Sequence, residues 1–277
     1  MLRLMTAAAF SASLTVSAAA AQTTQDDKID ALFEALGMIE MTEIMAEEGV
    51  AYGAQIAADM LPDGATPTWE AAIAAIYDPE VMRTELRDTL GTELAKADVD
   101  AMLNFFASAR GEGIIELELS ARRALLDEEV EEASKEFAAI AMADETPLYV
   151  LVDEFVETND LVESNVVGAL NSSYAFYLGL IDGGAMPAGV TPETALQDVW
   201  SQEDDIRTNT TEWVYGFLML AYQPLPQDDL EAYIAFFASD AGDAMNAALF
   251  TAFNGMFNDI SRALGLAASQ AMISQEL

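Results

Sequence analysis

The side chains in this sequence that can do chemistry are carboxylates, lysines, arginines, tyrosines, serines and methionines, because the chain has no His and no Cys. These two absences exclude Ser-His and Cys-His nucleophile pairs, imidazole or thiolate ligands for zinc and haem, and thiol redox chemistry. Catalysis by carboxylate, Lys, Arg, Tyr or Ser side chains and metal binding by oxygen or thioether ligands remain open. None of the 48 acidic residues is marked as one of a pair, so the sequence assigns no catalytic residue and no cofactor.

Three methionines have a spacing that can bring their sulfur atoms near one helix face. Met41 follows Met38 by three residues, and Met45 follows Met41 by four. Thioether clusters of exported proteins can bind Cu(I), which makes these residues a candidate metal site. The competing hypothesis is that Met41 and Met45 fill the core and that Met38 stands at a helix start. Equivalent positions later in the chain carry no Met, so a copper site would belong to one half only.

Acidic runs are a second candidate for cation binding. Glu203-Asp204-Asp205 and the glutamates between residues 128 and 132 can attract Ca²⁺. The sequence contains no EF-hand loop, whose ligands have a fixed spacing with a glycine in the middle. Loose cation screening by an acidic surface is the alternative explanation.

Arginines form a third candidate site, for an anion. Arg83 and Arg87 lie one helical turn apart, and Arg122 and Arg123 are adjacent. Together they can bind an anion through several guanidinium groups. The alternative is pairing with acids at helical spacing, which contributes a few tenths of a kcal/mol for each pair. Such partners are Glu80, Glu118 and Asp127.

The elements that must position these residues are organised around a stretch that occurs twice. It reads LAKADVDAMLNFFASARG at 94–111 and LPQDDLEAYIAFFASDAG at 225–242. Each motif has an aspartate, a Phe-Phe pair, a serine and a glycine. The first motif is Asp98, Phe105, Phe106, Ser108 and Gly111, and the second motif is Asp229, Phe236, Phe237, Ser239 and Gly242.

Each motif predicts a helix, a cap and a close contact. Apolar residues at i, i+3, i+4 and i+7 indicate one amphipathic helix whose acidic start suits the helix dipole. The serine is expected to cap the following helix, and the glycine to let two backbones approach closely. Neighbouring helix positions differ by about 100°, so one phenylalanine ring should enter its own core while the other faces an adjacent helix or the other motif.

A tandem duplication of one helical unit explains the rest of the chain. Aligning Ile29 with Leu151 sets Gly37 on Asn159, which predicts a left-handed turn at both residues. The alignment places the extra residues of the second half in the loop at 180–192.

Further matches support the same two units. Thr66 and Thr191 precede prolines and are expected to cap helices. Trp69 is aligned with Trp200 in the same comparison. The first half should contain one long helix over 109–143, and the last helix of the second half should fray after Gly265.

The chain begins with the features of a secretory signal peptide. Arg3 precedes an apolar run over 5–16, and three alanines precede Gln22. The run is far shorter than the ~20 residues of a membrane span. We therefore expect a signal peptide at 1–21, helical units at 22–145 and 146–277, a periplasmic location, and no transmembrane segment after cleavage.

No segment of the sequence has the alternation of apolar and polar residues that is typical of a half-buried strand. The segment Tyr149–Val156 is rich in residues that favour strands, but it matches a segment that is predicted to be a helix. The predicted fold is therefore all-α.

The net charge of −37 restricts the kinds of partner. So acidic a chain repels nucleic acid and anionic lipid, and attracts cations and basic proteins. Alternatively, the charge only keeps an exported protein soluble.

Both motifs resemble the bacterial exported family known as domain of unknown function 2059. Its pattern is an acidic helix start, then Phe-Tyr/Phe-x-Ser-Pro-x-Gly, then another helix, and the ten motif residues above carry the resemblance. The chain departs from the pattern at Ala95 and Pro226, where a Thr or Ser cap is usual, and at Ala109 and Asp240, where a proline is usual. The resemblance implies an all-helical periplasmic protein with no assigned reaction, and supplies no catalytic residue.

These observations favour a non-enzymatic envelope protein that acts by binding another envelope protein or a ligand. The alternative is a carboxylate-dependent or metal-dependent enzyme. The oligomeric state is left open.

Overall fold

The computed structural model describes residues 25–187 and 189–275, and every regular element among them is a helix. The predicted all-α fold is confirmed, while the predicted signal peptide at 1–21 lies outside the described residues. In the first half, a helix at 25–35 precedes α2 (Met38–Met60), α3 (Pro67–Ile76), α4 (Pro79–Glu93), α5 (Val99–Phe106), α6 (Ala109–Ala124) and α7 (Glu128–Ala143). In the second half follow α8 (Pro147–Thr158), α9 (Leu161–Gly183), α10 (Pro192–Trp200), α11 (Glu203–Tyr222), α12 (Gln227–Phe237) and α13 (Asp240–Gln275).

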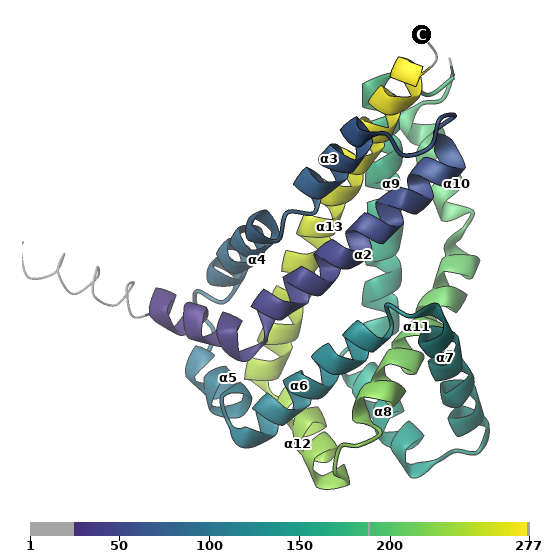
Figure 1. Cartoon of the computed structure of the whole chain (residues 1–277). Helices are drawn as coiled ribbons and strands as arrows, with labels where there is room; N and C mark the ends of the chain where they lie inside the picture. Colours follow the sequence, from purple (N-terminus) through teal and green to yellow (C-terminus); the bar gives the residue numbers. More distant parts are fainter. Residues whose placement is uncertain (1–24, 188, 276–277) are drawn as a thin grey trace, which may run out of the picture.

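The long helix α13 is the centre of the arrangement. It runs beside α9 along much of the molecule, and it also contacts α3, α4 and α5 of the first half (Figure 1). One hydrophobic core therefore draws residues from both halves, such as Leu86 and Met102 from the first and Met219 and Met256 from the second.

The two motifs have the same local geometry. Ser108 Oγ accepts a hydrogen bond from Gly111 N at 3.2 Å and donates one to the Phe105 carbonyl oxygen at 2.6 Å. The second motif repeats both bonds at the same lengths. A Cβ atom on Gly111 would overlap the Phe105 carbonyl oxygen and lie 2.5 Å from Phe106 Cα, and Gly242 is equally crowded. The predicted caps and close backbone contacts are thus confirmed.

The two rings of each phenylalanine pair have different surroundings, as the sequence predicted. Phe106 and Phe237 are buried, with 0% and 7% of their surface exposed. Phe105 instead stacks on Phe236, with ring centroids 4.7 Å apart. Tyr233 joins the cluster and stacks on Phe105 at 5.7 Å. The two motifs therefore pack directly against each other.

The aspartates of the two motifs have different roles. Asp98 caps α5, because its side chain accepts a hydrogen bond from Ala101 N at 3.1 Å. Asp229 lies inside the first turn of α12, where it pairs with Arg110 of the first half at 2.6 Å. An equivalent sequence position thus serves as a cap in one motif and as a link between the halves in the other.

The sequence alignment predicted a left-handed turn at Asn159 in the second half. This prediction is wrong by one residue. Gly37 has the expected φ of 64°, but Asn159 has φ −101° and Asp160 takes the turn with φ 50°. Asn159 is buried, and its side-chain amide donates to the Phe155 carbonyl oxygen at 2.9 Å. This bond keeps Asn159 on the end of α8, so the reversal falls one residue later.

Only part of the extra length expected in the loop at 180–192 lies there, since residues 184–191 join α9 to α10 where residues 61–66 join α2 to α3. The later helices add more, because α11 has 20 residues where α4 has 15, and α12 has 11 where α5 has 8. Trp69 and Trp200 match in the sequence, but their surroundings differ. Trp69 is buried and donates to the Gly53 carbonyl oxygen at 2.9 Å, whereas Trp200 is 58% exposed at the end of α10. The predicted caps Thr66 and Thr191 are confirmed.

Two predicted helix lengths need correction. The segment 109–143 is two helices, because Asp127 accepts a hydrogen bond from Glu129 N at 2.9 Å and starts α7. In contrast, α13 does not fray after Gly265 but continues to Gln275. Gly265 is a contact point, since a Cβ there would overlap the Phe176 carbonyl oxygen of α9. Tyr149–Val156 lies in α8, as predicted.

Loss of either buried motif ring should destabilise the protein strongly. We expect Phe106→Ala and Phe237→Ala each to lower the free energy of unfolding by about 3–5 kcal/mol, the usual cost of emptying a buried phenylalanine site. Phe137→Ala is the control, because Phe137 is 36% exposed on α7 and should cost about 1 kcal/mol or less. Urea unfolding followed by circular dichroism measures all three, and wild-type midpoints for both buried-ring variants would contradict the packing role.

Two glycines of α6 provide a matched test of the close backbone contact. Gly111→Ala should lower the free energy of unfolding by about 1–3 kcal/mol, because the added methyl group meets backbone atoms. Gly113→Ala adds its methyl group to open space and should raise stability by up to about 1 kcal/mol through helix propensity. Equal effects of the two substitutions on the urea midpoint would show that the close approach is not needed.

Candidate functional site

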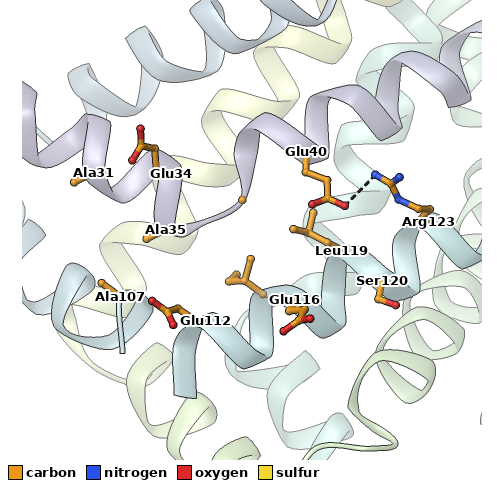
Figure 2. A pocket seen from close by; sticks show the side chains of 12 residues that line it. Ala31, Glu34, Ala35, Glu40, Ala107, Glu112, Glu116, Leu119, Ser120 and Arg123 are labelled. Carbon is orange, nitrogen blue, oxygen red and sulfur yellow. Dashed lines mark hydrogen bonds and ion pairs between the residues drawn. The ribbon is translucent and has the colours of Figure 1, made fainter. Parts of the chain in front are cut away.

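A groove of about 710 Å³ lies between the helix at 25–35, the start of α2, and α6 (Figure 2). Its lining combines apolar and charged residues. The apolar part of the lining, called the floor below, includes Ala31, Ala35, Gly37, Ile115 and Leu119, and the charged part, called the rim, is Glu34, Glu40, Glu112, Glu116 and Arg123.

The groove exists because the chain turns sharply at Gly37. Its positive φ of 64° separates the helix at 25–35 from α2 and is easily adopted by glycine. A Cβ at this position would lie only 2.6 Å from Leu119 Cδ1. Ile115 and Leu119 lie one turn apart on α6 and fit against this bend. The bare backbone of Gly37 therefore allows α6 to form the groove floor.

The rim carries unbalanced negative charge. Glu40 and Arg123 form an ion pair at 2.9 Å at one end of the groove, drawn as a dashed line in Figure 2. Glu34 projects from one wall, and Glu112 and Glu116 come from α6 on the other (Figure 2). These three exposed carboxylates have no ion-pair partner among the described residues. The groove thus offers apolar surface between acidic walls.

The methionines of the candidate copper site are placed in and around the core. Met38 and Met45 are buried in the hydrophobic core, and Met41 is partly buried against it. Each is therefore surrounded by the apolar side chains that the core-filling hypothesis expects. The copper hypothesis stays a prediction.

The arginines pair with carboxylates, mostly across helices and not at helical spacing. Arg122 makes two hydrogen bonds to Glu48, at 2.7 and 2.6 Å, and lies over the ring of Trp213. Only Arg83 has a partner that the sequence predicted, Glu80 at 2.6 Å. The other pairs are Arg83–Glu43, Arg87–Asp30, Arg87–Asp88 and Arg123–Glu40. The four guanidinium groups are thus engaged by acids, and Asp127 instead caps a helix.

Glu118, expected to pair with an arginine, instead turns its carboxyl group into the protein interior. The Tyr222 hydroxyl donates a 2.7 Å hydrogen bond to Glu118 Oε1, and Tyr233 also bonds to this carboxyl group. Burial raises the pKa of Glu118, while the two tyrosine hydrogen bonds partly oppose the shift. A signal for this burial existed in the sequence, because Glu118 continues the buried stripe of Gly111, Ile114 and Ile115 on α6.

The surroundings of Glu118 are filled by aromatic rings. Tyr222 and Tyr233 are buried, and both rings pack against Phe155 at centroid distances of 5.9 and 5.0 Å. Glu118 does not line the groove. Its carboxyl group is therefore a polar part of the packed core between the halves.

Comparison with known proteins adds no relative, since no family model, curated protein sequence or solved structure matches this chain. Within residues 25–187 and 189–275, no three His, Cys, Asp or Glu side chains converge as a metal site requires. No helix in the described part of the chain is long and apolar enough to cross a membrane. The acidic groove is accordingly the candidate site that the geometry itself defines.

The buried carboxyl group predicts a pH-dependent effect on stability. The folded pKa of Glu118 lies above its ordinary value of 4.5, so the folded state keeps the proton that the unfolded chain releases. This group therefore lowers the free energy of unfolding as pH rises from 4.5 to the folded pKa. Glu118→Gln has no carboxyl group to titrate, so the free energy of unfolding of this variant should not fall with pH in this way. We therefore expect the stability of the variant relative to wild type to increase with pH, by about 1.4 kcal/mol for each unit of pKa shift.

Urea unfolding at a series of pH values between about 4.5 and 8 measures this difference. Glu116→Gln, on an exposed position of the same helix, is the control and should show no such trend. A pH-independent difference between Glu118→Gln and wild type would mean that the carboxyl group is not held in its protonated form.

Proposed function

We propose that this protein is a non-enzymatic envelope protein that binds a basic, amphipathic segment of a partner protein in the groove between the helix at 25–35, α2 and α6. The observation that carries the proposal is the apolar floor between unpaired carboxylates. Amphipathic helices commonly bind by laying an apolar face into such a groove. Lysine or arginine side chains beside that apolar face would then meet Glu34, Glu112 and Glu116.

The charge of the whole chain supports the same choice of partner. A net charge of −37 attracts cationic segments from a distance and speeds their association. It also disfavours nucleic acid and anionic lipid as occupants. A basic protein segment therefore fits both the local and the overall charge.

The proposal includes export, duplication and family. The signal-like residues 1–21 favour a periplasmic location. The identical cap geometry in the two motifs favours a tandem duplication. The Phe-Phe-x-Ser-x-x-Gly pattern is the reason to propose kinship with domain of unknown function 2059. The enzymatic alternative has less support, because the buried carboxyl group of Glu118 packs among aromatic rings away from the groove.

Removal of the groove carboxylates tests the proposal. The probe is a fluorescein-labelled peptide of Leu and Lys at amphipathic helical spacing, titrated with the protein at low salt. The triple variant Glu34→Gln, Glu112→Gln, Glu116→Gln should bind it at least about tenfold more weakly, a loss of about 1.4 kcal/mol. Added salt should weaken wild-type binding as well, because it screens the carboxylates.

A second triple variant removes the same charge elsewhere. Glu128→Gln, Glu129→Gln, Glu136→Gln changes three exposed carboxylates on α7, and should bind the peptide nearly as well as wild type. If both triple variants lose the same affinity, the peptide follows only the overall charge, and the groove is not its site.

A further inference from the structure

A second cavity, of about 490 Å³, lies between α2, α9 and α13, away from the acidic groove. Helix α9 provides its longest wall, through residues at helical spacing on one face: Ser172, Ser173, Phe176, Tyr177 and Leu180. The opposite side comes from Tyr52 and Met60 of α2, and Ser261 and Leu264 belong to α13. Both halves of the chain thus contribute to one cavity.

The lining of this cavity carries no charged side chain, although the chain has 48 acidic residues. Its apolar part consists of methionine, leucine and phenylalanine side chains, which favour contact with an apolar body. A charged ligand would lose its hydration here without meeting an ion-pair partner. The chemistry of the wall therefore selects an uncharged molecule.

Several residues that line the cavity have a hydroxyl group with no protein partner among the described residues. Among the described residues, the hydroxyls of Tyr52, Tyr177, Ser173 and Ser261 make no hydrogen bond to the protein. Other hydroxyl groups in this protein are engaged: Thr251 donates to a carbonyl of its own helix at 2.9 Å, and Tyr222 donates to Glu118. The free hydroxyls can donate to and accept from a ligand inside an otherwise apolar site.

The wall formed by α9 and α13 is rigidly built. Gly265 of α13 lies directly on the backbone of α9, because a Cβ there would be 3.1 Å from Gly179 Cα and would overlap the Phe176 carbonyl oxygen. Beyond the cavity, Ser269 Oγ accepts a hydrogen bond from Ala185 N at 3.1 Å and holds the end of α9. The backbone that carries Phe176 and Leu264 is thus held in place before a ligand arrives, which reduces the ordering cost of binding.

We propose that this cavity is a binding site for an uncharged amphiphilic small molecule, with an apolar body and at least one hydroxyl or carbonyl group. The apolar body contacts Met60, Phe176 and Leu264, and the polar group bonds to the free serine and tyrosine hydroxyls. Tyr52 lines the cavity and is 50% exposed, so it also contacts solvent. This site is separate from the acidic groove and needs no protein partner.

Fluorescence of the uncharged dye N-phenyl-1-naphthylamine tests this site on the full chain. The dye should increase its emission on binding, and 1-decanol should displace it at least about tenfold more effectively than decanoate, which has the same chain length but a negative charge. Equal displacement by decanol and decanoate, or no binding of the dye, would overturn the proposal.

Filling the cavity should block the dye. Ser173→Phe should weaken dye binding by at least about tenfold, while Asn171→Phe, an exposed position on the same helix, should not. Met186→Trp, in the loop beside the cavity, is a second blocking variant that leaves α9 unchanged. Circular dichroism checks that each variant is folded. If folded Ser173→Phe or folded Met186→Trp binds the dye like wild type, the site is elsewhere.

The groove triple variant separates the two sites. Glu34→Gln, Glu112→Gln, Glu116→Gln should bind the dye like wild type, and weaker dye binding would contradict the proposed location.

Discussion

The structure depends on the contact between the two Phe-Phe motifs. Phe105 stacks on Phe236 at 4.7 Å, and beside them the glycines Gly111 and Gly242 let each following helix start directly against the preceding one. A larger residue at either glycine would push the helix away from the rings. The aromatic contact and the tight turns therefore support each other, and they hold α5, α6, α12 and α13 in one arrangement.

That arrangement places the helices that carry the rest of the molecule. Helix α6 leaves the first motif toward the bend at Gly37, where it forms the floor of the acidic groove. Helix α13 leaves the second motif and runs along α9, where glycine contacts bring the backbones together. Both cavities thus lie on helices that begin at a motif, so their shapes follow from the same central contact.

The charges of the two cavities reflect how a highly acidic chain can fold. Apolar periodicity sends nearly all carboxylates to the surface, where the groove rim keeps three of them without partners. Each arginine singled out from the sequence is already bound to acids, such as Arg122 to Glu48. A cationic partner can therefore gain ion pairs at the groove rim, whereas the second cavity, with its uncharged lining, discriminates by shape and hydrogen bonding.

The sequence by itself determined the features that arise within about four residues of each other. Helical periodicity, the caps at Ser108 and Thr66, the turn at Gly37 and the crowding at Gly111 are local, so their residue types predict them. Tertiary structure alone decided where helices break and meet. Asn159 does not adopt the predicted left-handed turn, because its buried side-chain hydrogen bond keeps it at the end of α8. Trp200 is exposed, although Trp69, its match in the sequence, is buried. The groove floor also depends on the contact between Gly37 and Leu119, which lies 82 positions later in the sequence. Such contacts depend on how many distant side chains pack at once, and no short pattern encodes that.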